Sequence, residues 1–188
     1  MEQRTIYVWD PVVRGSHWLI TFLFAASFFT AVIGEMPAHL WVSYLLTVVV
    51  LARIVWGFVG PPQARFSHFV PGPRALMAHL RAMSTGEDRR YLGHPPQGGV
   101  MAVILLLGLV IASVSGMMLP ALDRGAGPLG FLYGAQLPGE LISDVHIVSS
   151  YTLLVLVGMH ILGVTLSGRR EKQNLTAGMV DGYKRPSS

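Results

Sequence analysis

Four long runs of apolar residues, separated by shorter polar segments, organise the whole chain. The runs cover residues 15–34, 39–60, 98–119 and 145–168. Each is long enough to cross about 30 Å of hydrocarbon as a helix. Apart from histidines, the only ionisable basic or acidic side chain inside any of them is Arg53. The pattern therefore predicts an all-α integral membrane protein with four transmembrane helices.

Composition supports this prediction. Hydrophobic residues make up 52% of the 188 residues and charged residues only 13%, whereas a soluble domain carries about 25% charged residues. The chain has no cysteine, which excludes disulfides, thiolate-bound iron–sulfur clusters and covalent c-type haem attachment. In a membrane protein the net charge of +4 reflects topology, so we expect no nucleic-acid partner.

The basic residues predict the orientation of the spans. Of the 14 lysines and arginines, all but Arg53 and Arg124 fall in the N-terminal segment, the connection 61–97 or the C-terminal tail. The other two connections are mainly acidic, with Glu35, Asp123, Glu140 and Asp144. By the positive-inside rule, both termini and the connection 61–97 are cytoplasmic. We therefore expect one domain over residues 1–188, an antiparallel four-helix bundle. In a bacterium it would lie in the inner membrane, with the acidic connections facing the periplasm.

Two local signals refine this topology. Asp10 followed by Pro11 is typical of a helix N-terminus, because the carboxylate caps free N–H groups and proline suits the first helical position. The pattern of residues 74–83 predicts a short amphipathic helix lying on the membrane surface.

Four histidines lie within or at the ends of the apolar runs: His17, His39, His146 and His160. An ionisable side chain is costly to place in a bilayer and normally marks a functional site there. His146 and His160 are just under four helical turns apart, so both leave one helix face, about 21 Å apart along the axis. Sorted by depth in an antiparallel bundle, the four form two pairs: His17 with His160 inside, and His39 with His146 outside.

Such pairs suit haem. Two imidazoles on facing helices can supply both axial ligands of a haem iron, and small residues let a flat macrocycle approach. The small residues near the histidines are Ser43, Ser149, Ser150, Gly158 and Gly163. Zinc normally takes more protein ligands in tetrahedral geometry. The spacing by itself is also compatible with a proton or ion relay and with histidines that serve only packing.

Local sequences resemble the bacterial cytochrome b561 and nickel–iron hydrogenase b-type cytochrome family. The similar segments are 9–11 (Trp-Asp-Pro), 14–18, 39–44, 52–60, 64–69, 91–99, 145–151 and 158–160. The resemblance implies a four-helix cytochrome with two haem b groups, linking a periplasmic redox partner to membrane quinone. It also implies that His17, His39, His146 and His160 are the axial ligands. Ser43 replaces a glycine common in the family, and the connection 121–144 matches no family pattern.

Arg53 is a further candidate for cofactor binding. It lies 14 residues after His39, on the same helix face but nearer the cytoplasm. We expect it to pair with a propionate of the inner haem. The competing interpretation is an arginine that extends its charged end to the membrane surface.

The favoured function is transmembrane electron transfer as a subunit of a larger oxidoreductase. A hydrogenase, a c-type cytochrome or another periplasmic oxidoreductase would be compatible partners. A second hypothesis is a stand-alone quinone-linked enzyme acting on a small diffusible substrate such as superoxide, although the acidic outer connections disfavour an anionic substrate. A third is a non-haem proton or ion transporter, but the spans lack the carboxylates that relays normally use.

Overall fold

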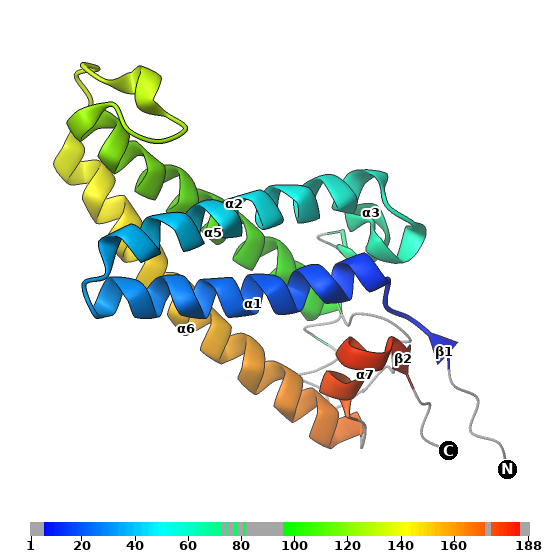
Figure 1. The fold of residues 1–188 in the computed structure, drawn as a ribbon. Helices are drawn as coiled ribbons and strands as arrows, with labels where there is room; N and C mark the ends of the chain where they lie inside the picture. The colour runs from blue at the N-terminus through cyan, green and yellow to red at the C-terminus, as the bar shows by residue number, and fades with distance from the viewer. Residues whose placement is uncertain are drawn as a thin grey trace, which may run out of the picture. The chain divides into compact units, whose positions relative to one another are not determined.

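Four long helices dominate the structure, a computed structural model that describes residues 6–72, 74, 77, 78, 81, 96–171 and 174–184. The long helices are α1 (Pro11–Val32), α2 (Met36–Val59), α5 (Pro96–Arg124) and α6 (Gly139–Glu171) (Figure 1). The short elements are β1 (Ile6–Tyr7), η1 (Pro62–Ala64), α3 (Phe66–Phe69), η2 (Gly130–Leu132), α7 (Leu175–Asp181) and β2 (Tyr183–Lys184).

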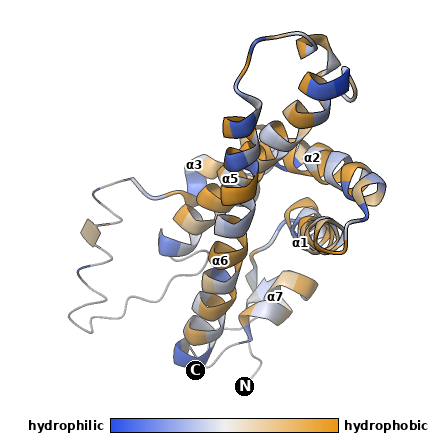
Figure 2. Cartoon of the chain, turned by 90° about the vertical axis from the view of Figure 1, so that its left-hand side faces the viewer, coloured by the Kyte–Doolittle hydropathy of each residue, from blue (hydrophilic) through white to orange (hydrophobic). Residues whose placement is uncertain are grey.

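The predicted all-α class with four long apolar helices is confirmed. All four long helices are long and apolar enough to cross a membrane, and hydrophobic residues run along each of them (Figure 2). Many large apolar side chains point outward, among them Phe22, Trp41 and Phe58, which are 69%, 74% and 69% exposed. A helix with exposed apolar side chains suits lipid rather than water. The predicted amphipathic helix at 74–83 lies mostly outside the described residues.

The chain divides into two compact units, and every long helix contributes to both. The first unit comprises residues 1–19, 51–104 and 158–188, and the second comprises 20–50 and 105–157. His17, Arg53 and His160 belong to the first unit, whereas His39 and His146 belong to the second.

Asp10 organises the start of α1 in the first unit, as its sequence position predicted. One carboxylate oxygen accepts hydrogen bonds from the backbone N–H groups of Val12 and Val13 at 2.9 and 3.0 Å. The same oxygen accepts a third hydrogen bond, at 3.0 Å, from the indole Nε1 of Trp56 on α2. Asp10 is only 8% exposed, so these donors satisfy a buried charge that would otherwise be costly.

The C-terminal segment packs against the beginning of the chain. β2 pairs antiparallel with β1, with Tyr7 opposite Tyr183 (Figure 1). The indole of Trp18 donates to the carbonyl of Met179 at 3.1 Å, and the Arg14 guanidinium donates to the carbonyl of Val180. Both terminal segments therefore meet at the start of α1, a contact that the hydrophobic pattern could not predict.

A tight turn joins α1 to α2 in the second unit. Gly34 adopts φ +81°, a left-handed conformation that glycine reaches without steric cost. The N–H groups of Gly34 and Glu35 then donate to the carbonyls of Ala31 and Thr30, which closes the last turn of α1. Because α2 begins at Met36, this short turn brings the first turns of α2 beside the end of α1.

We expect replacement of Asp10 by alanine to lower the free energy of unfolding by about 2 kcal/mol, because the helix cap is lost and the Trp56 N–H is left unpaired. Thermal unfolding of the detergent-solubilised protein measures this loss. The control is Trp56→Phe, which keeps the cap and should cost about half as much. Equal stability of Asp10→Ala and wild type would contradict the assigned role of Asp10.

Candidate functional site

His39 and His146, called the outer pair after the side of the membrane expected from the sequence, lie in the second unit. The ring centroids of His39, on α2, and His146, on α6, are 6.2 Å apart and the ring planes are inclined by 70°. Both residues are half-buried. The structure thus brings together two histidines that were expected to form a pair because they lie at the same predicted depth in the membrane.

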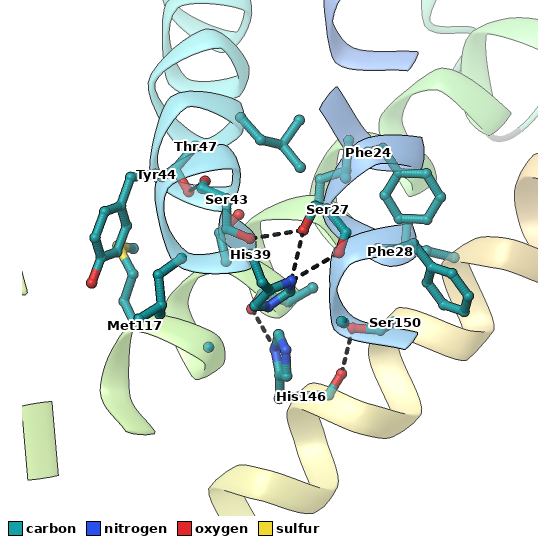
Figure 3. Close-up of a pocket in the computed structure, with 18 of the residues that line it drawn as sticks. Phe24, Ser27, Phe28, His39, Ser43, Tyr44, Thr47, Met117, His146 and Ser150 are labelled. Atoms are coloured by element: carbon teal, nitrogen blue, oxygen red, sulfur yellow. Dashed lines mark hydrogen bonds between the residues drawn. The ribbon is translucent and has the colours of Figure 1, made fainter. Parts of the chain in front are cut away.

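Each of these two rings is oriented by a backbone carbonyl (Figure 3). His39 Nδ1 lies 2.9 Å from the carbonyl oxygen of Ser27, and His146 Nδ1 lies 2.9 Å from that of Ala112. A carbonyl oxygen only accepts hydrogen bonds, so in both rings Nδ1 carries the hydrogen. The lone pair of each neutral imidazole is therefore on Nε2, the arrangement typical of a metal-bound histidine with a supporting hydrogen bond.

Ser27 connects α1 to both His39 and Ser43 of α2. Its hydroxyl lies 3.3 Å from His39 Nδ1 and 2.8 Å from the hydroxyl of Ser43 (Figure 3). Ser27 is only 8% exposed, so its hydroxyl depends on these partners. Ser43 therefore has a defined role in this chain as the hydrogen-bond partner of Ser27.

Gly116 on α5 provides the space for the His146 ring. A Cβ at this position would lie 2.7 Å from Cε1 and 3.0 Å from Nδ1 of that ring, which is closer than van der Waals contact allows. Pro120 follows four residues later inside α5 and cannot donate a helical hydrogen bond to the Gly116 carbonyl. Sequence reasoning missed Gly116, because a glycine in a transmembrane helix carries no signal of what packs against it.

A cavity of about 240 Å³ surrounds the pair (Figure 3). All four long helices line it, and its walls are mostly apolar, with hydroxyl groups among them. The polar lining residues are Ser27, His39, Ser43, Tyr44, Thr47, Ser113, His146, Ser150 and Tyr151. Ser43 and Ser150, two of the small residues expected near a macrocycle, are among them. Apolar walls with two imidazoles suit a flat hydrophobic ligand that needs axial coordination.

His17 and His160, called the inner pair after their expected cytoplasmic side, lie in the first unit. The ring centroids of His17, on α1, and His160, on α6, are 6.3 Å apart, with the planes inclined by 53°. A Cβ at Gly158, two residues before His160, would meet no protein atom within 4 Å. The structure therefore places these rings together, with open space beside the helix that carries one of them.

Arg53 is a buried cation beside the inner pair. It is 8% exposed, and it interacts electrostatically with His17 and Asp10. Its guanidinium carbon lies 5.6 Å from the centre of the Phe66 ring. Among the described residues, its Nη1 atom has no hydrogen-bond partner. A buried guanidinium donor of this kind is suited to an anionic group such as a carboxylate.

The chemistry of the donors fits haem better than zinc. A metal–imidazole bond of about 2 Å on each side places the two ring centres roughly 6 Å apart, as in both pairs. Within the described part of the chain, no three His, Cys, Asp or Glu residues gather into a group that could hold a metal ion. Each pair thus offers two nitrogen ligands, too few for a tetrahedral zinc site but sufficient for the axial positions of a haem iron.

Known proteins resemble this chain over nearly its full length. A protein from Azotobacter chroococcum mcd 1 named "Probable Ni/Fe-hydrogenase B-type cytochrome subunit" is 27% identical, covering 97% of this chain and 90% of its own. Proteins of the same name from Rhizobium leguminosarum bv. viciae and Rhodobacter capsulatus are 24% and 22% identical. They cover 98% and 97% of this chain and 90% and 82% of their own lengths. No solved structure matches.

The family model for prokaryotic cytochrome b561 matches residues 8–182. That range includes all four long helices and all four histidines. The resemblance drawn from the local sequences is thereby confirmed: the chain belongs to the prokaryotic cytochrome b561 family.

Proposed function

We propose that this protein transfers electrons across a membrane through two b-type haems, one held by His17 and His160 and the other by His39 and His146. Membership of the cytochrome b561 family implies membrane electron transfer by haem b. The observation that carries the finer proposal is the geometry of the outer pair. Both rings donate from Nδ1 to a backbone carbonyl, which leaves both Nε2 lone pairs available to one metal ion.

The residues around the outer pair hold and orient the ligands. Ser27, Ser43 and the Ala112 carbonyl fix the two ring orientations, and the apolar cavity walls exclude water. Haem, when bound, supplies an iron that accepts and releases one electron. A haem held by two histidines of one pair would have no ligand position left for O₂ or a substrate, so these residues favour electron transfer over oxygen chemistry.

The redox partners are inferred from the names of the similar proteins, and the membrane from the distribution of basic residues along the chain. The similar proteins are named as hydrogenase cytochrome subunits, so we infer a nickel–iron hydrogenase as the favoured periplasmic partner, with membrane quinone at the cytoplasmic end. The distribution of lysine and arginine supports a bacterial inner membrane with both termini cytoplasmic.

The first prediction from this proposed function concerns haem content and pairing. Purified wild-type protein should contain two haem b per chain, measured by the pyridine haemochrome assay against protein concentration. Each single alanine variant of the four histidines should contain one, because an axial ligand is lost. His17→Ala and His160→Ala should share one residual redox potential, and His39→Ala and His146→Ala should share another.

Double variants sharpen this test. His17→Ala/His160→Ala should retain the outer haem, since both changes affect one site, whereas His17→Ala/His39→Ala should contain none. A haem retained in the second variant would show that the pairing is wrong. A colourless wild-type protein would remove the electron-transfer proposal and favour the transporter hypothesis.

The second prediction uses the close approach at Gly116. Gly116→Ala should displace the His146 ring and lower the outer haem content at least severalfold, because the added Cβ overlaps Cε1. The inner haem should stay bound. Gly139→Ala at the start of α6, where a Cβ would meet no neighbouring atom within 4 Å, is the matched control and should keep both haems. Retention of both haems at wild-type potentials in Gly116→Ala would contradict the assigned geometry.

The third prediction concerns Arg53. We propose that its guanidinium binds a propionate of the inner haem, so Arg53→Gln should lower the midpoint potential of that haem by about 60 mV, equivalent to a tenfold change in its one-electron reduction equilibrium. The loss of a nearby positive charge disfavours the added electron. Arg53→Lys should recover most of this shift. Spectroelectrochemical titration measures both haems, and an inner potential unchanged in Arg53→Gln would refute the assignment.

A further inference from the structure

Arg124 is an isolated cation on the otherwise acidic side of the chain. It ends α5, and the neighbouring charges on the two outer connections are Glu35, Asp123, Glu140 and Asp144. Neither the histidine pairs nor the positive-inside pattern accounts for an arginine at this position. Its surroundings in the second unit indicate what it can bind.

Arg124, itself exposed, lines a second cavity that is open to the surface and has a volume of about 400 Å³, together with residues from the first turns of α2. The lining residues are Met36, Pro37, Leu40, Trp41, Tyr44 and Arg124. Leu40 and Tyr44 also line the cavity that contains His39 and His146, so the two cavities adjoin along α2. Tyr44 stands at the edge of the histidine-containing cavity (Figure 3).

The backbone around Arg124 is held in place. The N–H groups of Gly125 and Ala126 donate to the carbonyls of Ala121 and Pro120 at 3.0 and 3.1 Å, which closes the end of α5. Gly127, at φ +81°, approaches Tyr44 so closely that a Cβ there would lie 2.5 Å from the phenol oxygen. The segment that follows Arg124 is thereby packed directly against Tyr44.

The second cavity combines one cation with hydrogen-bond donors and apolar walls. Among the described residues that line it, Arg124 is the only charged one. The Tyr44 hydroxyl and the Trp41 indole are further hydrogen-bond donors, and the other side chains are apolar. Trp41 packs edge-on against Tyr44 with ring centroids 6.0 Å apart. A guanidinium and a phenol hydroxyl can both donate hydrogen bonds to a carboxylate. The apolar wall suits a hydrophobic ring system to which that carboxylate is attached.

We propose that Arg124 and Tyr44 bind a propionate of the outer haem, an inference that rests on the proposed function of the outer histidine pair. Arg124 would then serve the outer haem as Arg53 serves the inner one. The guanidinium neutralises the propionate and stabilises the reduced state of the nearby iron through its positive charge. Tyr44, which lines both cavities, donates a hydrogen bond to the same carboxylate.

The test is the midpoint potential of each haem in the intact, haem-loaded protein. Arg124→Gln should lower the outer potential by about 59 mV, a tenfold change in the reduction equilibrium, and leave the inner potential unchanged. Tyr44→Phe should give a smaller shift of the same sign, and Arg124→Lys should recover most of the loss. Asp123→Asn, a charge change next to Arg124 at a residue outside the cavity lining, is the matched control and should shift the outer potential much less.

Different results would refute the proposed function and the propionate assignment. Absence of the outer haem from wild-type protein would refute the proposed function itself. An outer haem bound at wild-type potential in Arg124→Gln would refute the propionate assignment alone. An equal shift of both haems would also refute it, since a general field effect does not require contact. Loss of a co-purified phospholipid from Arg124→Gln, seen by native mass spectrometry with both potentials unchanged, would assign the second cavity to a lipid headgroup instead.

Discussion

The outer site depends on hydrogen bonds from imidazole Nδ1 atoms to backbone carbonyls of other helices. His39 on α2 is tied to α1 through Ser27, and His146 on α6 is tied to α5 through Ala112. Each bond fixes a tautomer and a ring direction at once. It also links helices that apolar packing alone would leave free to slide, since in lipid the hydrophobic effect does not hold helices together. In this unit the same hydrogen bonds therefore orient the histidine rings and hold neighbouring helices together.

The same constraint explains why small and hydroxyl-bearing residues gather at this site. A ring that must reach a carbonyl on the next helix needs that helix to come close, and Gly116 allows this for His146. Hydroxyl groups can satisfy their own hydrogen bonds within a helix, as Ser150 does with the His146 carbonyl at 2.7 Å. Such residues line the cavity without leaving unpaired polar atoms in an apolar environment.

Much of the architecture was predictable because the bilayer imposes simple rules. Length and hydropathy predicted the four long helices, the Asp10–Pro11 pair predicted the start of α1, and depth predicted which histidines meet. Contacts between residues distant in sequence were not predictable. Nothing in the local sequence indicates that Trp56 donates to Asp10, that Ser27 accepts from His39, or that Tyr44 packs against Gly127. These contacts depend on how the helices pack, which periodicity does not encode.

The contact between the two ends of the chain bears on the order of assembly during synthesis. Chains are made from the N-terminus, and the second unit ends at residue 157, so all of its residues have been made before those of the tail. The first unit needs residues 158–188, including His160 and the strand β2 that pairs with β1. Synthesis that stops after residue 157 would therefore give a chain that contains both His39 and His146 but lacks His160, the partner of His17. The His39–His146 pair could then form before the C-terminal tail is made, whereas the His17–His160 pair could not.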